Sequence, residues 1–318
     1  MHTLAWRVAA LVSASFSLAV MTAQVPSILI SNVQYAIAQG NVDAAAAEVA
    51  QFRSMRGNTP EALEALSWVA RGELLAGRLD EAAKVANEVR ELTIGSLHGN
   101  PLDADPHLAV ALGASFEVSA LALDARHEKT EALQLLETAL HTWHATSIAT
   151  RLRKNINLMT MTGKPLPPVQ ETEWIVAKPP ALASLHGKVL VLYFWAHWCP
   201  DCKADAPILA RIAKEFEKRG LVIIAPTRLY GYTPTSDPAD PATEKAFILR
   251  TFDKFYSSIP NISVPFSAAN FDRFGVSTTP TFVIVDRHGI VRLYHPGALD
   301  EPQLRAAIEP LLLPRVGK

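Results

Sequence analysis

Cys199 and Cys202 are the two cysteines of this 318-residue chain, and they stand three positions apart in the stretch YFWAHWCPDCKADAP. Such a pair suits a structural disulfide, half of a metal site, or a redox couple. As a cross-link it is weak, because closing so short a loop removes little entropy from the unfolded chain. A structural zinc site normally has four protein ligands, commonly two such cysteine pairs, and this chain has one pair. We therefore interpret Cys199 and Cys202 as a redox couple.

The ten histidines do not complete a metal site with this pair. The close pair His141 and His144 lies far away in sequence within a helical pattern, and we interpret it as a solvated helix face rather than as half of a metal site. We expect the protein to need neither a metal nor another cofactor.

The residues around the pair predict a strand followed by a helix. The apolar run 188–195 (KVLVLYFW) has the length and composition of a strand buried on both faces. Apolar residues then recur at helical spacing over 202–220, up to a glycine stop. Cys199 thus falls at the start of a helix, where free N–H groups and the helix dipole favour a thiolate. We expect Cys199 to be the nucleophile and Cys202, deeper in the helix, to be the resolving thiol.

Three stretches of the C-terminal half resemble the thioredoxin superfamily. The order strand, Trp-Cys-x-x-Cys-Lys, helix with Pro207 is similar to its active site, and KVLVLYFWAHWCPDCKADAP resembles its exported TlpA/ResA-like branch. Residues 163–188 resemble that branch's leading segment with a short edge hairpin, and 275–297 its cis-proline strand and hairpin, turning at 287–289. The resemblance covers about residues 160–318. It implies an α/β thioredoxin-like domain, a central mixed sheet flanked by helices, over 162–318.

The resemblance also assigns residues around the sulfur pair. It implies a cis bond before Pro280, although most X–Pro bonds are trans. The backbone of Thr279 would then face the sulfurs and bind an extended substrate peptide like an added strand. Trp198 and Pro200 would line the same substrate site. With Cys199 and Cys202, Pro280 belongs to the expected catalytic set.

Two departures from the family pattern concern acidic groups. Tyr193 stands six residues before Cys199, where ordinary thioredoxin has a buried aspartate that helps to deprotonate the resolving thiol. Asp205, three residues after Cys202, matches a carboxylate that in ResA-like proteins plays a comparable part in deprotonating the resolving thiol. We therefore expect Asp205 to transfer protons during disulfide exchange. The alternative is that Asp205 only interacts favourably with the positive N-terminal end of the helix. Asp201, between the cysteines, disfavours the Cys199 thiolate and favours a reducing couple, whereas a protonated His197 would act in the opposite direction.

The chain between the second expected strand (LVIIAP) and Ser267 is longer than a compact thioredoxin needs. It holds a Pro/Asp/Thr-rich loop over 233–243 and a predicted helix near 244–256. Long loops at the carboxyl ends of such strands often border a binding site. A surface insertion without function is the alternative.

The first 23 residues are typical of an export signal. Arg7 precedes an apolar run from Val8 to Val20, and small residues follow at which cleavage after Ala19 or Ala23 is plausible. An uncleaved membrane anchor and a first core helix are the alternatives.

Residues 24–161 predict an all-α domain of TPR-like helical hairpins. The phrases AIAQGNVDAAAAEVA (36–50) and LLAGRLDEAAKVANEV (74–89) repeat one pattern of helix, glycine turn and alanine-rich helix. A third unit near 128–143 has lost its glycine, and the loop 94–107 interrupts any strict array. A plain helical bundle is the alternative. In either case we expect a docking platform for proteins, since no cluster here looks catalytic.

These features together predict an exported, periplasmic or extracytoplasmic thiol-disulfide oxidoreductase. Cys199 would attack protein disulfides, and a membrane thiol reductant would restore the pair. The resemblance suggests a part in cytochrome c maturation or metal-centre assembly. A dithiol oxidase or isomerase, and a helical scaffold with a vestigial thioredoxin domain, are the alternatives. A peroxiredoxin wants a threonine and a proline before its cysteine, and AHWCPDC has neither there. The net charge of −1 offers no support for nucleic-acid binding.

Overall fold

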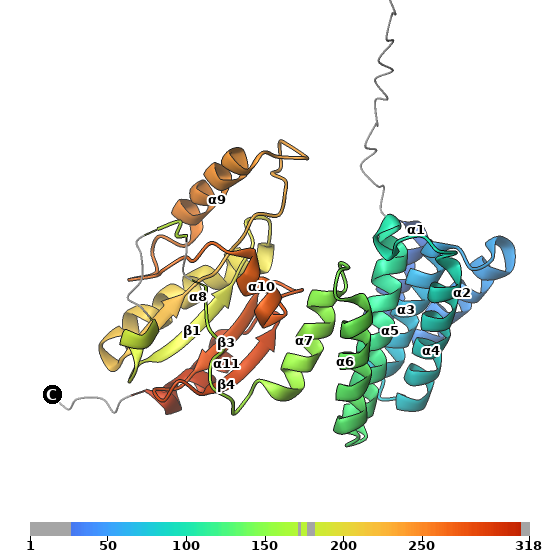
Figure 1. The fold of residues 1–318 in the computed structure, drawn as a ribbon, viewed down its shortest axis with the longest axis horizontal. Coiled ribbons are helices and arrows are strands. Elements are labelled where there is room, and N and C mark those ends of the chain that lie inside the picture. The colour runs from blue at the N-terminus through green and yellow to red at the C-terminus, as the bar shows by residue number, and fades with distance from the viewer. Residues whose placement is uncertain (1–26, 171–172, 177–181, 313–318) are drawn as a thin grey trace, which may run out of the picture.

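The computed structural model describes residues 27–170, 173–176 and 182–312. It shows a helical half followed by an α/β half, which lie side by side in Figure 1. The predicted export signal at 1–23 lies outside the described residues.

The helical half begins with two hairpins of the predicted kind. Their helices are α1 (Ile28–Ala38), α2 (Val42–Arg56), α3 (Pro60–Leu75) and α4 (Leu79–Ser96). Each hairpin turns through a glycine in the left-handed region, with φ of 74° at Gly40 and 72° at Gly77. These glycines explain the repeated sequence phrase, because other residues adopt that conformation at a cost.

A third hairpin keeps the same turn without glycine. It consists of α5 (Pro106–Ala125) and α6 (Lys129–Trp143), and it follows a loop that contains the short helix η1 (Leu102–Ala104). His127 takes the turn position with φ of 65°. Its N–H donates to the carbonyl of Asp124 at 2.9 Å, as Gly77 donates to Leu74 at 3.0 Å. The third hairpin therefore has the same turn conformation, with histidine in place of glycine.

The helices form the layered arrangement of TPR-like hairpins. Helix α1 packs on α3 and α3 packs on α5; α2 and α4 each pack both on their own partner and on the first helix of the next hairpin, and α6 packs on α5. Helix α5 is long and apolar enough to cross a membrane, but it is mostly buried among its neighbours. It is the core helix of this half.

Helix α7 (Ala149–Thr160) joins the two halves. It packs on α5 and α6 on one side and on α10 (Ala268–Phe274) and β4 (Val291–Pro296) on the other, as Figure 1 shows. The expected domain boundary between residues 161 and 162 therefore comes just after α7, a helix that contacts both halves.

A four-stranded mixed sheet forms the centre of the second half. Its strands are β1 (Val189–Phe194), β2 (Leu221–Ile224), β3 (Thr281–Val285) and β4, in the order β2-β1-β3-β4. Strand β2 runs parallel to β1, whereas β3 runs antiparallel to both β1 and β4. The hairpin between β3 and β4 turns at Gly289, with φ of 79°. The predicted mixed sheet is confirmed.

Helices cover both faces of this sheet. Val191 and Tyr193 of β1 point into one core with α8 (Pro200–Phe216), α9 (Pro241–Phe255) and α11 (Glu301–Ile308). Leu192 and Phe194 alternate with them and enter the second core, with α10. This alternation buries β1 completely, as its apolar run predicts. Short 3₁₀ helices lie at Leu182–Leu185, Glu217–Arg219 and Glu309–Leu311.

The segment before β1 does not pair with itself in its described residues. Instead Pro165 bridges Ile290 and Trp174 bridges Pro265, both antiparallel. The expected short edge hairpin is therefore wrong for the part of 163–188 that the structure describes, because these residues find partners in distant segments.

Candidate active site

Cys199 and Cys202 form a disulfide at the N-terminus of α8. Cys199 is the N-cap residue of the helix, and the N–H of Cys202 donates to its Sγ at 3.1 Å. Pro200 occupies the first turn of α8, where its missing N–H costs nothing. An N–H aimed at the Cys199 sulfur stabilises negative charge there.

The pair is almost covered in this oxidised state. Cys199 is 2% exposed and Cys202 is fully buried, while Trp198, one residue earlier, is 41% exposed. Cys202 is more buried than Cys199, as expected, but the difference is small. Of the pair, only Cys199 presents any surface to a partner protein.

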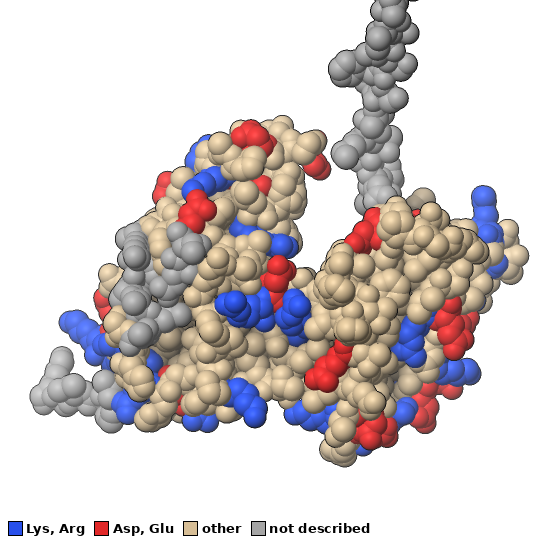
Figure 2. All heavy atoms as spheres, in the orientation of Figure 1, with Lys and Arg blue, Asp and Glu red and all other residues tan. Residues whose placement is uncertain are grey.

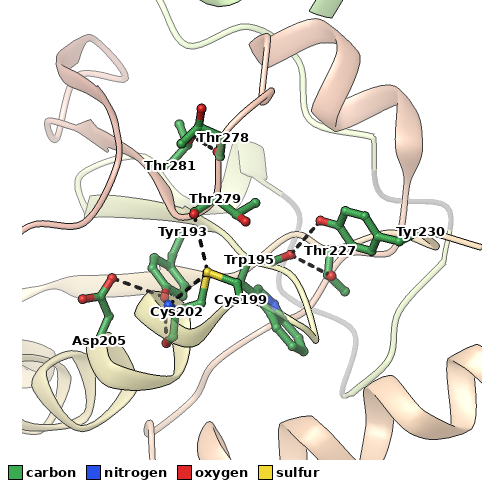
Figure 3. Close-up of a disulfide and its surroundings, with 10 residues drawn as sticks. All are labelled: Tyr193, Trp195, Cys199, Cys202, Asp205, Thr227, Tyr230, Thr278, Thr279 and Thr281. Carbon is green, nitrogen blue, oxygen red and sulfur yellow. Dashed lines mark hydrogen bonds between the residues drawn. A yellow bond between two sulfur atoms is a disulfide. The ribbon is translucent and has the colours of Figure 1, made fainter. Parts of the chain in front are cut away.

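The loop before β3 faces Cys199 from the opposite side (Figure 3). The peptide bond between Thr279 and Pro280 is cis, as expected. The carbonyl oxygen of Thr279 lies 3.4 Å from the Sγ of Cys199. In the disulfide this sulfur has no proton, so the approach is a contact; a reduced Cys199 thiol could donate to the same oxygen.

Asp205 lies beneath the disulfide, on α8, and is 4% exposed. Burial raises its pKa to about 6, and the charge of Asp201 adds to this rise. The hydroxyl of Tyr193 donates to the carbonyl of Cys202 at 2.9 Å and to Asp205 at 3.5 Å, which lowers the Asp205 pKa in part. Tyr193 therefore occupies the place of the missing aspartate and holds the remaining carboxyl near the resolving cysteine (Figure 3).

His197 links the cysteine loop to the long insertion, a contact that the sequence did not indicate. Its Nε2 lies 3.1 Å from a carboxylate oxygen of Glu244 on α9. Glu244 also accepts from the backbone N–H groups of Tyr230 and Gly231, at 2.6 and 2.8 Å. Burial lowers the pKa of His197, so it is neutral at pH 7 and does not oppose the effect of Asp201 on Cys199.

The insertion also contacts the loop directly. The hydroxyls of Thr227 and Tyr230 donate to the carbonyl of Trp195 at 2.9 and 3.3 Å (Figure 3). The Tyr230 ring also meets Trp198 edge-on. This packing contradicts a loose insertion for its first residues. Helix α9 begins at Pro241, earlier than predicted, because Asp240 caps it and Pro241 opens it.

The structure brings every predicted site residue to one place. Cys199, Pro200, Cys202 and Asp205 come from the start of α8, Trp198 from the loop before it, and Thr279 and Pro280 from the loop before β3. No group of three or more metal-ligating side chains occurs in the described ranges.

Residues 162–227 match the AhpC/TSA family. The thiol-disulfide oxidoreductase ResA of Halalkalibacterium halodurans is 26% identical over 128 residues, which cover 40% of this chain and 65% of that protein. The thiol:disulfide interchange protein DsbE of Xylella fastidiosa (strain Temecula1) is 29% identical over 128 residues, 40% of this chain and 57% of that protein. The C-terminal half of the chain is a thioredoxin-like domain.

Less than two thirds of either relative is matched. A crystal structure of a thioredoxin family protein from Chlorobium tepidum is similar to 46% of this chain and 97% of its own, with a TM-score of 0.38 and 19% identity. The family match at 162–227 lies within the thioredoxin-like domain.

Proposed function

We propose that this protein is an exported thiol-disulfide oxidoreductase that reduces disulfides of other proteins through Cys199 and Cys202. One observation carries the proposal: the Cys199 sulfur lies at a helix start, receives the Cys202 N–H, and faces the Thr279 carbonyl. A nucleophilic sulfur beside a half-buried backbone acceptor suits attack on an extended polypeptide.

The reaction proceeds in two exchanges. The Cys199 thiolate attacks one sulfur of the substrate disulfide, and the other substrate sulfur leaves as a thiolate. Asp205 takes the proton of Cys202, whose sulfur then attacks the Cys199 Sγ and releases the second substrate sulfur. The substrate gains two electrons, and the Cys199–Cys202 disulfide remains. A membrane thiol reductant then restores the pair.

The reducing direction follows from the charges around the sulfurs. Asp201 stands between the cysteines and disfavours the Cys199 thiolate, while neutral His197 adds no compensating charge. A less stabilised thiolate accompanies a more reducing couple. We expect a reduction potential nearer to the roughly −270 mV of thioredoxin than to the roughly −120 mV of the oxidant DsbA. A value near the latter would favour the oxidase or isomerase.

Export is supported by the N-terminal sequence and by the name of one relative. A relative from Mycobacterium tuberculosis, 58% identical over 31 residues, is called soluble secreted antigen MPT53. Cytochrome c maturation and metal-centre assembly are the roles that the family resemblance suggests. We expect the helical domain over 24–161 to bind partner proteins.

The activity is tested with insulin and dithiothreitol. The purified protein should accelerate reduction of the insulin disulfides, and Cys199→Ser should abolish that acceleration. Equal rates for the two proteins would favour the scaffold alternative, in which the helical half binds partners and the cysteine pair is vestigial.

A further inference from the structure

A groove of about 400 Å³ lies where the two halves meet. One wall comes from the helical half, from the beginnings of α5 and α7 and the loops before them; the other includes Ser277, from the loop before β3. Figure 2 shows a notch between the two halves on one face of the molecule. Its lining includes Pro106, Ala109, Val110, Ile148, Arg151 and Ser277.

The two walls are held in a fixed relation by α7. Thr150 and Arg153 of α7 donate to the side chain and the backbone carbonyl of Asp272, at 3.2 and 2.9 Å. Gly275 follows three residues after Asp272, and a Cβ on it would lie 2.4 Å from the backbone nitrogen of Lys154. The backbone that leads to the cis proline therefore rests on the helical half without space for a side chain.

The groove continues the surface at which Cys199 meets Thr279. Ser277 stands two residues before Thr279, whose carbonyl faces the Cys199 sulfur. Both Ser277 and Thr278 are exposed. An extended peptide advances about 3.3 Å per residue. A polypeptide whose cysteine reacts with Cys199 thus needs only a few further residues to reach the groove.

The chemistry of the helical wall fits an apolar segment. Pro106, Ala109, Val110 and Ile148 present aliphatic groups to the groove. The guanidinium of Arg151 is paired with the carboxylate of Glu117, which also binds Lys154 at 3.0 Å. Its charge is therefore already engaged. Asp103 and Ser147 also line this wall, but they bind each other, with the Ser147 N–H and hydroxyl donating to the Asp103 carboxylate. The aliphatic groups are the part of the wall without such a partner.

We propose that this groove binds the apolar polypeptide segment that flanks the reacting cysteine of the substrate. The helical half then selects substrates for the thioredoxin-like domain, rather than only docking other proteins. The inference rests on the proposed function, because it needs a polypeptide disulfide at Cys199.

The test uses two synthetic peptides, each with a central cysteine joined to thionitrobenzoate. Leucine and valine flank the cysteine in one, and glycine and serine in the other. Release of thionitrobenzoate by the reduced protein gives kcat and KM for each. We expect kcat/KM to favour the apolar peptide by about tenfold, mainly through KM.

Two variants should abolish this preference from opposite walls. Val110→Arg places a charge on the helical wall, and Ser277→Trp fills the groove from the other side; both should bring the ratio of the two kcat/KM values to about one. Ile94→Arg makes the same kind of change on α4, at a side chain that is 45% exposed, and should leave the ratio unchanged. Circular dichroism checks that each variant is folded.

The outcomes separate the two proposals. A wild-type ratio near one, or a ratio that both groove variants preserve, overturns the groove. A wild-type dimer that Val110→Arg converts to a monomer would show instead that the groove binds a second copy. No release from either peptide by the wild-type protein would contradict the proposed function itself.

Discussion

Tyr193 and Asp205 meet directly beneath the disulfide, with the Tyr193 hydroxyl 3.5 Å from the Oδ2 of Asp205. Both side chains are buried, and the same hydroxyl binds the Cys202 carbonyl at 2.9 Å. A tyrosine in place of an aspartate thus leaves a single carboxyl beneath the pair and fixes it close to the resolving cysteine.

Asp205→Asn should remove the pH dependence of the second exchange. The carboxylate, with a pKa of about 6, accepts the Cys202 proton only above that pH. We expect the wild-type rate of resolution to fall as the pH drops through 6, and the variant to be slower at pH 7.5 by on the order of 10²-fold. Stopped-flow release of thiol from a mixed disulfide on Cys199 measures this rate.

Two neighbouring variants check that the inflection belongs to Asp205. Asp201→Asn changes the exposed carboxylate between the cysteines and should keep an inflection, at a slightly lower pH because its charge raises the Asp205 pKa. Tyr193→Phe should move the inflection upward, because the Tyr193 hydrogen bond lowers that pKa. An inflection that persists in Asp205→Asn would assign the proton transfer to another group.

Asp205→Asn should also stabilise the oxidised protein at neutral pH. The native carboxyl titrates at about 6 and the unfolded one near 3.8, so between these values the native state holds more protons and wild-type stability falls as the pH rises. The Asp205→Asn variant has no carboxyl to ionise at this position and therefore does not lose stability in this way as the pH rises. The gain should reach at most about 3 kcal/mol above pH 6 and vanish below pH 4, as urea unfolding can measure. A gain independent of pH would exclude this cause.

Glu244→Ala should release the insertion from the cysteine loop. The substitution removes the acceptor for two backbone N–H groups and for His197, all of them part-buried or buried. We expect a loss of about 2–4 kcal/mol in the free energy of unfolding, together with faster proteolysis within 229–240. Glu244→Gln keeps one acceptor oxygen and should lose less. Unchanged proteolysis would mean that α9 is held by its apolar contacts alone.

Gly275→Ala should weaken the contact between the halves. Its φ of 63° disfavours a side chain, and the closeness of Lys154 leaves no space for one. Gly289→Ala is a matched control, since its φ is 79° but no atom lies within 4 Å of the added Cβ. The left-handed conformation costs each variant about 1 kcal/mol, and the clash should cost Gly275→Ala about 2 kcal/mol more. Equal losses in thermal unfolding would contradict a close contact at Gly275.

Local patterns in the sequence predicted the elements that carry the site. The apolar run at 189–194 and the helix after Cys199 each depend on near neighbours in the chain, and both are present. The turn at Gly289 is also present, but it was predicted from the family resemblance. The cis bond before Pro280 was available only through family resemblance, because the local sequence favours trans.

Contacts between distant segments were beyond reach from sequence. His197 and Glu244 are 47 positions apart, and nothing in either stretch signals the other. The placement of α7 against Asp272 and Gly275 likewise depends on how two halves pack. The start of α9 at Pro241 was recognisable, since Asp240 followed by proline is an N-terminal signal.

The central claim, that Cys199 is the attacking thiol, is tested most directly by comparing the two single-cysteine variants. Reduced Cys202→Ala and Cys199→Ala are mixed with a peptide disulfide at pH 7, and the rate of mixed-disulfide formation is followed by mass spectrometry. Because Cys199 keeps 2% of its surface exposed and faces Thr279 whereas Cys202 has no exposed surface, Cys202→Ala should react at least about tenfold faster. Equal rates, or faster reaction of Cys199→Ala, would contradict this assignment.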